Sequence, residues 1–356
     1  MKNAKWVLLT LVVALLVALI VGCGQKQASN SGTSGPQQAQ QTQKKLKIGY
    51  IYLTLEHPYY QAHQKWTQKW AKDMGIDLVE LDGKMDAGTM TNQIENLVAQ
   101  KVDGIVYCLV NPASGASDIN YAQQNGIPII SFAIKHGNAA KAPFVGIDEL
   151  TAGKMVGKAA AEKFKQLFPN KKAKIALIRM PGVEATENRA NGFVEGFKSV
   201  ISDATVVAEV DGGGVRDKSM AGMEAIIQAH PELNVVYGIN GDSALGALAA
   251  LEGAGRGTIK TELVVSHDGS EPEILKLINP DSALKVSIAN QPKELSKATL
   301  DTILEVINKK RDMKNTDNIY VPAKVLEPDI DKLQQFIKEE YWSTTDLKAE
   351  AAKFKK

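Results

Sequence analysis

The sequence predicts an α/β protein with two similar parallel-sheet units and a cleft between them. Short apolar runs alternate with longer amphipathic stretches along most of the chain, which is the pattern of strands and helices in parallel sheets. About 310 residues follow the polar N-terminal region, which is more than one ordinary core occupies. Several predicted strands end in Gly, Asn, Asp or His, at the edge of a parallel sheet where ligands bind.

The first unit is predicted from the alternation between residues 46 and 132. Apolar runs indicate its strands, and stretches with apolar residues at helical spacing indicate the helices between them. The pattern predicts strands at 47–52, 77–81, 104–110 and 128–132, with helices at 58–74, 86–100 and 117–125.

The second unit is predicted from the same alternation farther along the chain. The helix at 294–308 and the segment at 319–325 are too little for a third domain, so we expect them to return to the first sheet and then to touch the second. The second unit itself is predicted to have helices at 151–167, 186–200, 218–229, 243–252 and 272–279, alternating with strands at 174–179, 204–210, 235–239, 263–267 and 283–288.

The C-terminal residues 328–356 are rich in Lys and Glu. Phe336, Tyr341 and Trp342 have roughly helical spacing in this segment. We therefore expect a C-terminal helical extension that packs on the surface and frays at its end.

The N-terminal segment resembles the leader of a bacterial lipoprotein. Lys2 and Lys5 precede an uncharged apolar stretch that ends at Ile-Val-Gly-Cys, with the cysteine at position 23. The resemblance implies that residues 1–22 are a signal peptide and that Cys23 is the lipid-attached first residue of the mature protein. Residues 23–45 are predicted to be a flexible tether because they are polar and contain no aromatic residue. An uncleaved membrane anchor is the alternative.

Composition excludes several classes of function. The formal net charge is +2, and the two leader lysines account for it. The mature chain therefore lacks the excess of basic residues that is typical of nucleic-acid-binding proteins. Cys108 lies in an apolar run and is predicted to fill the core. It has no disulfide partner in the chain, because the other cysteine, Cys23, is expected to carry the lipid. Five histidines without paired spacing predict no metal site, and we expect no cofactor.

Short motifs at strand ends and helix starts carry a family resemblance. Together and in this order they resemble the ribose-binding, type I periplasmic sugar-binding family over residues 45–327. The resemblance implies two doubly wound lobes, joined by three crossovers, that close on a sugar. The motifs are Leu-Glu-His-Pro-Tyr-Tyr (55–60), Gly-Ile-Pro-Ile-Ile (126–130), Glu-Asn-Arg-Ala-Asn-Gly-Phe (187–193), Ala-His-Pro (229–231), Asn-Gly-Asp-Ser-Ala-Leu-Gly-Ala (240–247), His-Asp-Gly (267–269) and Ile-Ala-Asn-Gln-Pro (288–292).

The lobes are expected to share the chain between them. We predict an N-terminal lobe of residues 46–147 plus 291–318 and a C-terminal lobe of residues 148–290 plus 319–327. The segment 328–356 then forms an extension outside both lobes.

The first lobe is expected to contribute His57, Tyr59 and Tyr60 to the ligand site. The tyrosines begin a helix directly after a strand, so a ring can cover the apolar face of a sugar and a phenol can bind a hydroxyl. The alternatives are two core aromatic residues and, for His57, a turn residue.

The second lobe is expected to contribute Arg189, because its planar donors suit paired hydroxyls or a carboxylate and the family has a ligand arginine at this point of the motif. We expect Arg189→Ala to abolish binding and leave the fold intact. The alternative is a surface arginine paired with Glu187 or Glu195.

Asn240 and Asp268 each follow a predicted strand, where an amide and a carboxylate can bind vicinal hydroxyls. The alternative for both is local capping of the next helix or turn. Asn290 is placed at the site by the resemblance, which gives the family a ligand amide beside the third crossover, and its alternative is a turn residue before Pro292.

Two stretches depart from the family pattern. Ala133-Ile134-Lys135-His136 stands where its sugar binders usually have Asp-Arg or Asn, and residues 211–216 lack the aromatic residue that stacks on a second sugar face. A sugar alcohol, a modified sugar, a nucleoside or an acid is therefore an alternative to an ordinary sugar. Lys135, His136 and Arg189 together are expected to tolerate a negative charge.

The functional prediction is capture of a small polar ligand without catalysis. Nucleophile-elbow and phosphate-loop motifs are absent, and the glycines at 212–214 lack dinucleotide-binding spacing. We expect a monomeric, extracytoplasmic, lipid-anchored solute-binding protein that serves the membrane permease of an ABC transporter, a partner implied by the resemblance. The alternative is a ligand-sensing module for a chemoreceptor or sensor kinase.

Overall fold

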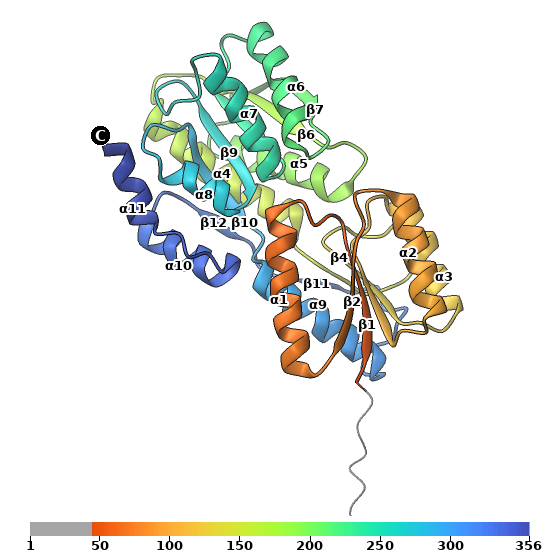
Figure 1. Cartoon of the computed structure of the whole chain (residues 1–356). Helices are drawn as coiled ribbons and strands as arrows, with labels where there is room; N and C mark the ends of the chain where they lie inside the picture. Colours follow the sequence, from red (N-terminus) through yellow and green to blue (C-terminus); the bar gives the residue numbers. More distant parts are fainter. Residues whose placement is uncertain (1–44, 356) are drawn as a thin grey trace, which may run out of the picture. The chain divides into compact units, whose positions relative to one another are not determined.

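Two six-stranded sheets organise residues 45–355, the part of the chain that the computed structural model describes (Figure 1). The first sheet is wholly parallel, with the strand order β2-β1-β3-β4-β5-β11. Its strands are β1 (Lys47–Tyr52), β2 (Asp77–Asp82), β3 (Gly104–Tyr107), β4 (Ile129–Phe132), β5 (Phe144–Gly146) and β11 (Asn318–Tyr320).

Helices cover both faces of the first sheet. α1 packs beside α9, and α2 packs beside α3 (Figure 1). The apolar side chains of these helices and strands form one buried core, so this lobe has its own centre of stability. The helices are α1 (Pro58–Met74), α2 (Ala87–Ala99), α3 (Pro112–Gln124) and α9 (Pro292–Ile307).

The second sheet has the order β7-β6-β8-β9-β10-β12, and only β12 runs antiparallel to its neighbour. Separate apolar clusters lie on its two faces. Its strands are β6 (Lys174–Arg179), β7 (Thr205–Asp211), β8 (Val235–Gly238), β9 (Leu263–Asp268), β10 (Leu284–Ala289) and β12 (Lys324–Leu326), and its helices are α4 (Glu149–Leu167), α5 (Glu184–Lys198), α6 (Arg216–Ala229), α7 (Gly241–Gly253) and α8 (Glu271–Ile278).

Several helices begin directly after a residue whose side chain caps the first turn. Asp86 accepts a hydrogen bond from the Thr89 amide, and Asp148 accepts one from the Thr151 amide. α3 begins five residues before its predicted start because Asn111 accepts a hydrogen bond from the Ala113 amide and Pro112 occupies the first helical position. The apolar periodicity alone does not reveal that first turn.

The chain crosses between the lobes after β5, after β10 and after β11. We predicted the last crossing after residue 318, but β11 runs to Tyr320 in the first sheet, and β12 joins the second sheet only at Lys324. Pro322 lies between them and has no amide hydrogen, so the segment cannot continue as a single paired strand.

The C-terminal extension forms two helices instead of one, α10 (Ile330–Tyr341) and α11 (Leu347–Ala352), followed by a short 3-10 turn. Trp342 ends α10 with a backbone φ of 56°. α10 contacts α8 of the second lobe and also α1 and α9 of the first (Figure 1). The Trp66 indole donates a hydrogen bond to the Glu340 carbonyl at 2.8 Å, which joins this extension to α1.

Cys108 is a free thiol buried in the first core, as predicted. Burial raises its pKa to about 12, so the thiol is not ionised near neutral pH.

Within residues 45–355, no helix is both long enough and apolar enough to cross a lipid bilayer.

Candidate functional site

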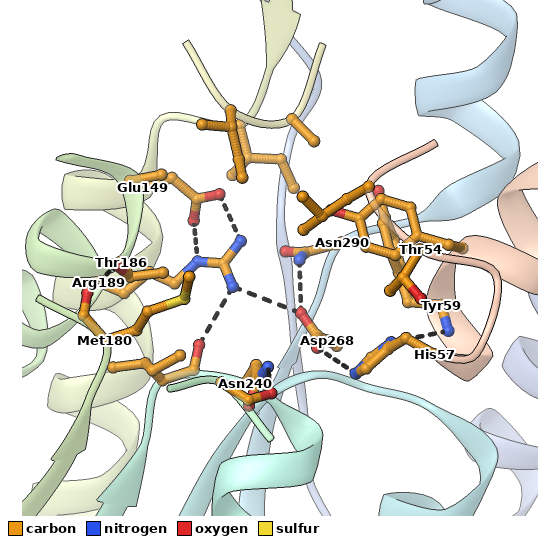
Figure 2. A pocket seen from close by; sticks show the side chains of 18 of the residues that line it. Thr54, His57, Tyr59, Glu149, Met180, Thr186, Arg189, Asn240, Asp268 and Asn290 are labelled. Carbon is orange, nitrogen blue, oxygen red and sulfur yellow. Dashed lines mark hydrogen bonds and ion pairs between the residues drawn. The ribbon is translucent and has the colours of Figure 1, made fainter. Parts of the chain in front are cut away.

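One pocket lies where the carboxyl ends of both sheets face each other (Figure 2). α1, α4, α5 and α7 all begin beside it, and the positive partial charge at their N-termini stabilises the Glu149 and Asp268 carboxylates of the pocket wall. The structure brings all seven predicted site residues to its wall: His57, Tyr59, Tyr60, Arg189, Asn240, Asp268 and Asn290.

His57 connects the two lobes at this pocket. Its Nδ1 accepts a hydrogen bond from the Tyr59 amide at 3.2 Å, so the histidine caps α1 as the turn alternative anticipated. Its Nε2 lies 3.6 Å from Asp242 Oδ2 and 3.6 Å from Asp268 Oδ2, both on the second lobe. The side chain therefore has a capping role and an interlobe contact at once.

The two tyrosines differ in how their hydroxyls are used. The Tyr60 hydroxyl lies 3.5 Å from the Cys108 thiol, whereas the Tyr59 hydroxyl has no hydrogen-bond partner among residues 45–355. Tyr59 is only 4% exposed and lines the pocket, and burial raises its pKa well above the usual range. A neutral phenol that faces the pocket without a partner is available to a ligand.

The Arg189 side chain is only 12% exposed, and Figure 2 shows that it is already paired. Its Nε and Nη2 donate to the Glu149 carboxylate at 2.8 and 2.6 Å, and its Nη1 donates to the Ile239 carbonyl at 3.1 Å. Nη1 also lies 3.6 Å from Asp268 Oδ1. The predicted alternative of a surface arginine paired with Glu187 or Glu195 is wrong.

The packing of α4 against α5 creates this ion pair. A β-carbon on Gly153 would lie 2.5 Å from the Arg189 carbonyl oxygen, and one on Gly192 would lie 2.4 Å from the Leu150 carbonyl oxygen. These glycines are required because only they let the two backbones approach so closely. The approach brings the first residue of α4, Glu149, within hydrogen-bonding distance of Arg189.

Glu149 is the charged pocket residue that sequence reasoning missed. Burial alone would raise its pKa, but the Arg189 guanidinium outweighs burial and lowers the pKa to about 2. An acid in the first turn is ordinary for a helix start, so its sequence context carried no distinct signal. Its only cue is that it closely follows a buried strand at a crossover.

Asp268 and Asn290 form a hydrogen-bonded pair at the ends of β9 and β10. Asn290 Nδ2 donates to Asp268 Oδ1 at 2.8 Å, and the Gly241 amide donates to Asp268 Oδ2 at 3.2 Å. Asp268 has a φ of 99°, an uncommon value for a residue with a side chain. Two protein donors leave further lone pairs on this carboxylate for a ligand.

His267 supports this pair from behind. Its Nε2 donates to Asn290 Oδ1 at 3.1 Å, an assignment that follows because the Asn290 amide nitrogen already donates to Asp268. The Tyr237 hydroxyl then donates to His267 Nδ1 at 3.2 Å. Burial and the nearby Arg189 lower the pKa of His267, so the ring is neutral near pH 7. The orientation of Asn290 is thus set by a buried chain.

Asn240 lines the pocket but both of its polar atoms are engaged. Its Oδ1 accepts a hydrogen bond from the Ser243 amide at 2.8 Å, and its Nδ2 donates to the Gly214 carbonyl at 2.8 Å. The capping alternative that we named for this residue therefore describes its state in the structure. A ligand meets an oriented amide with one remaining hydrogen and one remaining lone pair.

The expected tolerance of a negative ligand is not supported by the geometry. Lys135 and His136 do not line the pocket, and His136 Nδ1 lies 2.7 Å from the Ser131 hydroxyl. Burial, together with Lys135, lowers the pKa of His136 to about 4, so it is neutral at pH 7. Because Glu149 neutralises Arg189, no uncompensated cation faces the pocket wall within residues 45–355.

The departure at Ala133 and Ile134 leaves an apolar surface. Both residues line the pocket, together with Leu53, Met85 and the neighbouring Thr54, so neither of the two positions supplies the acid that the family pattern would place there. No group of three or more His, Cys, Asp or Glu side chains within residues 45–355 could hold a metal ion.

The chain belongs to the periplasmic binding protein domain family, which its residues 48–311 match. It is 28% identical over 316 residues to the ribose import binding protein RbsB of Bacillus subtilis (strain 168), covering 87% of this chain and 95% of that protein. It is 30% identical over 283 residues to the ABC transporter periplasmic-binding protein YphF of Escherichia coli (strain K12), covering 77% of this chain and 84% of that protein.

Solved structures share this fold. A periplasmic solute binding protein of an ABC transporter from Actinobacillus succinogenes, with bound D-allose, matches with a TM-score of 0.72 at 24% identity, covering 82% of this chain and 100% of that chain. A solute binding protein of an ABC transporter from Mycobacterium smegmatis, with bound glycerol, matches with a TM-score of 0.73 at 23% identity. The match covers 85% of this chain and 98% of that chain. The predicted family and two-lobed fold class are confirmed.

Proposed function

We propose that this protein is an extracytoplasmic solute-binding lipoprotein that captures a neutral sugar or sugar alcohol between its lobes and delivers it to an ABC permease. The observation that carries the proposal is a pocket whose polar groups come from both lobes and include the unpartnered Tyr59 hydroxyl and the oriented Asp268 carboxylate. The names of relatives support it, since they include ribose import binding proteins and a xylitol-binding protein of Mycolicibacterium smegmatis, 26% identical over 264 residues.

The charge of the pocket favours a neutral ligand. Arg189 contributes one positive charge, and Glu149 and Asp268 contribute two negative charges. An anionic ligand would meet the Asp268 carboxylate without a cation to balance it, and repulsion at close range inside a protein is costly. Sugar acids are therefore expected to bind far more weakly than sugars or sugar alcohols.

Capture follows from contacts with both lobes. A ligand that touches Tyr59 on one lobe and Asp268 on the other stabilises the closed arrangement more than the open one. We propose that the permease recognises this closed form and that binding involves no chemical change in the ligand.

A thermal-shift screen of residues 45–356 tests the proposal, because a ligand that binds only the folded state raises the melting temperature. The panel holds sugars, sugar alcohols, sugar acids, nucleosides and amino acids. A shift with a sugar or sugar alcohol, confirmed by calorimetry, is the expected result. A response confined to nucleosides, amino acids or sugar acids would contradict it.

Tyr59→Phe is expected to weaken binding of the ligand found in that screen about fivefold to tenfold, the size of one lost hydrogen bond. Its melting temperature should stay close to wild type, because the hydroxyl has no protein partner within residues 45–355. Calorimetry on Tyr60→Phe is the control, since that hydroxyl faces Cys108 and its loss should change affinity less than twofold. Equal affinities of Tyr59→Phe and wild type would remove Tyr59 from the site.

The lipid attachment at Cys23 lies outside the described residues and is part of the proposal. Cys23→Ser is expected to move the protein from the membrane fraction to the soluble fraction after cell lysis, because it removes the thiol that carries the lipid. Fractionation followed by immunoblotting measures the change. A variant that stays with the membrane would show that the N-terminal segment anchors the chain in another way.

A further inference from the structure

Glu273 is a second carboxylate that lies behind Asp268, outside the pocket. It is the third residue of α8 and is fully buried, but it does not line the pocket. The Gly241 amide donates to Asp268 Oδ2 at 3.2 Å, and a β-carbon on Gly241 would lie 2.5 Å from Glu273 Oε2. Gly241 therefore lies against both carboxylates, and its lack of a side chain lets Glu273 come so close.

The Glu273 carboxylate accepts four hydrogen bonds. Its Oε1 accepts from the Gly269 amide at 3.3 Å and from the Ser287 hydroxyl at 3.0 Å. Its Oε2 accepts from the Ser270 amide and the Ser270 hydroxyl, both at 2.6 Å. A helix-capping box accounts for the bond from the Ser270 amide alone. The other bonds join α8 to β10 and to the turn that follows Asp268.

The backbone that these bonds hold is strained at Asp268. Asp268 and Gly269 have φ values of 99° and 68°, and a positive φ is unfavourable for a residue with a side chain. This turn directs the Asp268 carboxylate into the pocket, where Asn290 donates to it (Figure 2). Without the Glu273 carboxylate, the two amides that follow Asp268 would be buried without an acceptor, which is costly. Glu273 therefore stabilises the conformation that exposes Asp268 to a ligand.

The grip on the turn depends on the charge of Glu273. Burial and the nearby Asp268 carboxylate raise the pKa of Glu273 to about 7, so both of its forms are present near neutral pH. The ionised form accepts all four bonds, whereas the protonated form carries a hydrogen on one oxygen and accepts fewer. Ser266 Oγ is buried near Glu273 without a hydrogen-bond partner within residues 45–355, so it can accept that hydrogen. Only the ionised form holds the turn completely.

Two other ionisable side chains face Glu273 from neighbouring elements. They are Asp268, at the end of β9, and Tyr341 of α10. Burial raises the pKa of Tyr341 well above the usual range, so the phenol is neutral. Lys285 of β10 lies at the other end of α8, where it donates to the Leu277 carbonyl at 3.4 Å, and burial lowers its pKa to about 8. Variants that change Glu273 alone are therefore needed to assign a pH dependence to it.

We propose that Glu273 is a positioning residue for ligand binding: its ionised carboxylate holds the turn after β9 so that Asp268 points at the ligand. The inference rests on the proposed function, since the ligand is the sugar or sugar alcohol that Asp268 binds. A ligand hydroxyl that donates to Asp268 favours ionised Glu273 for a second reason, because it weakens the repulsion between the two carboxylates. The contribution of Glu273 to affinity therefore increases as the pH rises through neutrality.

Glu273→Gln tests the inference, because glutamine has the size of glutamate and resembles its protonated form. Calorimetry uses D-ribose, D-allose, D-galactose, xylitol and myo-inositol, and the comparison is made with the compound that binds wild type most tightly. At pH 8.5 the variant is expected to bind about tenfold more weakly than wild type, the size of one lost hydrogen bond to a charged group. At pH 5.5, where the wild-type side chain is itself mostly protonated, the two affinities should agree within about twofold.

The ratio of the two affinities isolates Glu273, because His57 and Lys285 are the same in both proteins. A ratio that is the same at both pH values overturns this inference and leaves the proposed function standing. A wild-type protein that binds none of the five compounds overturns both.

Glu271→Gln is the matched control, since it makes the same change in the same helix. Glu271 accepts a hydrogen bond from the Thr345 hydroxyl of the C-terminal extension, so its affinity should stay within about twofold of wild type at both pH values.

Should Glu273→Gln fail to fold, Ser287→Ala tests the same point. It removes a donor that stabilises the ionised form of Glu273, so the pH at which the affinity rises is expected to increase by about half a unit or more. An unchanged pH dependence in folded Ser287→Ala would overturn the inference.

Discussion

Arg189→Ala is expected to destabilise the fold by about 3–5 kcal/mol, as well as to abolish ligand binding, because it leaves a buried charge without its partner. That charge is the Glu149 carboxylate, which is buried and accepts two hydrogen bonds from the guanidinium. From the sequence we expected this substitution to leave the fold intact. The buried ion pair with Glu149 changes that expectation to a loss of stability. Urea denaturation followed by circular dichroism measures the loss of stability, and calorimetry measures the loss of binding.

The double variant Arg189→Met with Glu149→Gln separates the two effects. It removes both charges and keeps similar volumes, so most of the stability is expected to return while ligand binding stays absent. Equal urea midpoints for Arg189→Ala and wild type would show that Glu149 does not depend on Arg189 for its stability in the folded protein.

Phe336→Ala is expected to cost about 3–5 kcal/mol, the usual price of truncating a buried phenylalanine. Phe336 lies in α10, is only 4% exposed, and packs in one core with Leu333, Ile337 and Tyr341. This core joins the C-terminal extension to the second lobe. Deletion of residues 328–356 is expected to be more damaging still, because all of these apolar contacts are lost together.

Phe354→Ala is the matched control for Phe336→Ala. Phe354 belongs to the same extension but is 38% exposed, so its truncation should change stability by less than about 0.5 kcal/mol. Similar urea midpoints for the two variants would indicate that α10 is not docked in solution.

α10 also contacts a residue of the ligand pocket. The Tyr341 hydroxyl donates to the backbone carbonyl of Asp268 at 3.2 Å, and Glu340 accepts a hydrogen bond from the Lys293 amide at the start of α9. The extension therefore holds the strained backbone of Asp268 from one side and the first lobe from the other. The helical spacing at the C-terminus predicted a packed helix, but it carried no information on these contacts.

The sequence by itself determined the architecture and predicted which residues come together at the candidate site. Alternating apolar runs and amphipathic stretches are local patterns, so they predict strands and helices without knowledge of distant contacts. His57, Asn240 and Asp268 lie together because the carboxyl ends of parallel strands meet at one edge of each sheet, and Arg189 joins them from α5. The positions of the first three at strand ends could be predicted from the sequence, whereas Arg189 was predicted from its donors and its motif.

Only the tertiary structure decided how these side chains are used. Glu149 and Arg189 are 40 residues apart, and they pair because glycines let α4 and α5 approach closely, a contact that no local pattern encodes. The neutral state of His136 likewise depends on burial. The charge of the pocket, on which the proposed class of ligand depends, follows from such long-range contacts, because burial and pairing are properties of the packed fold and not of sequence neighbours.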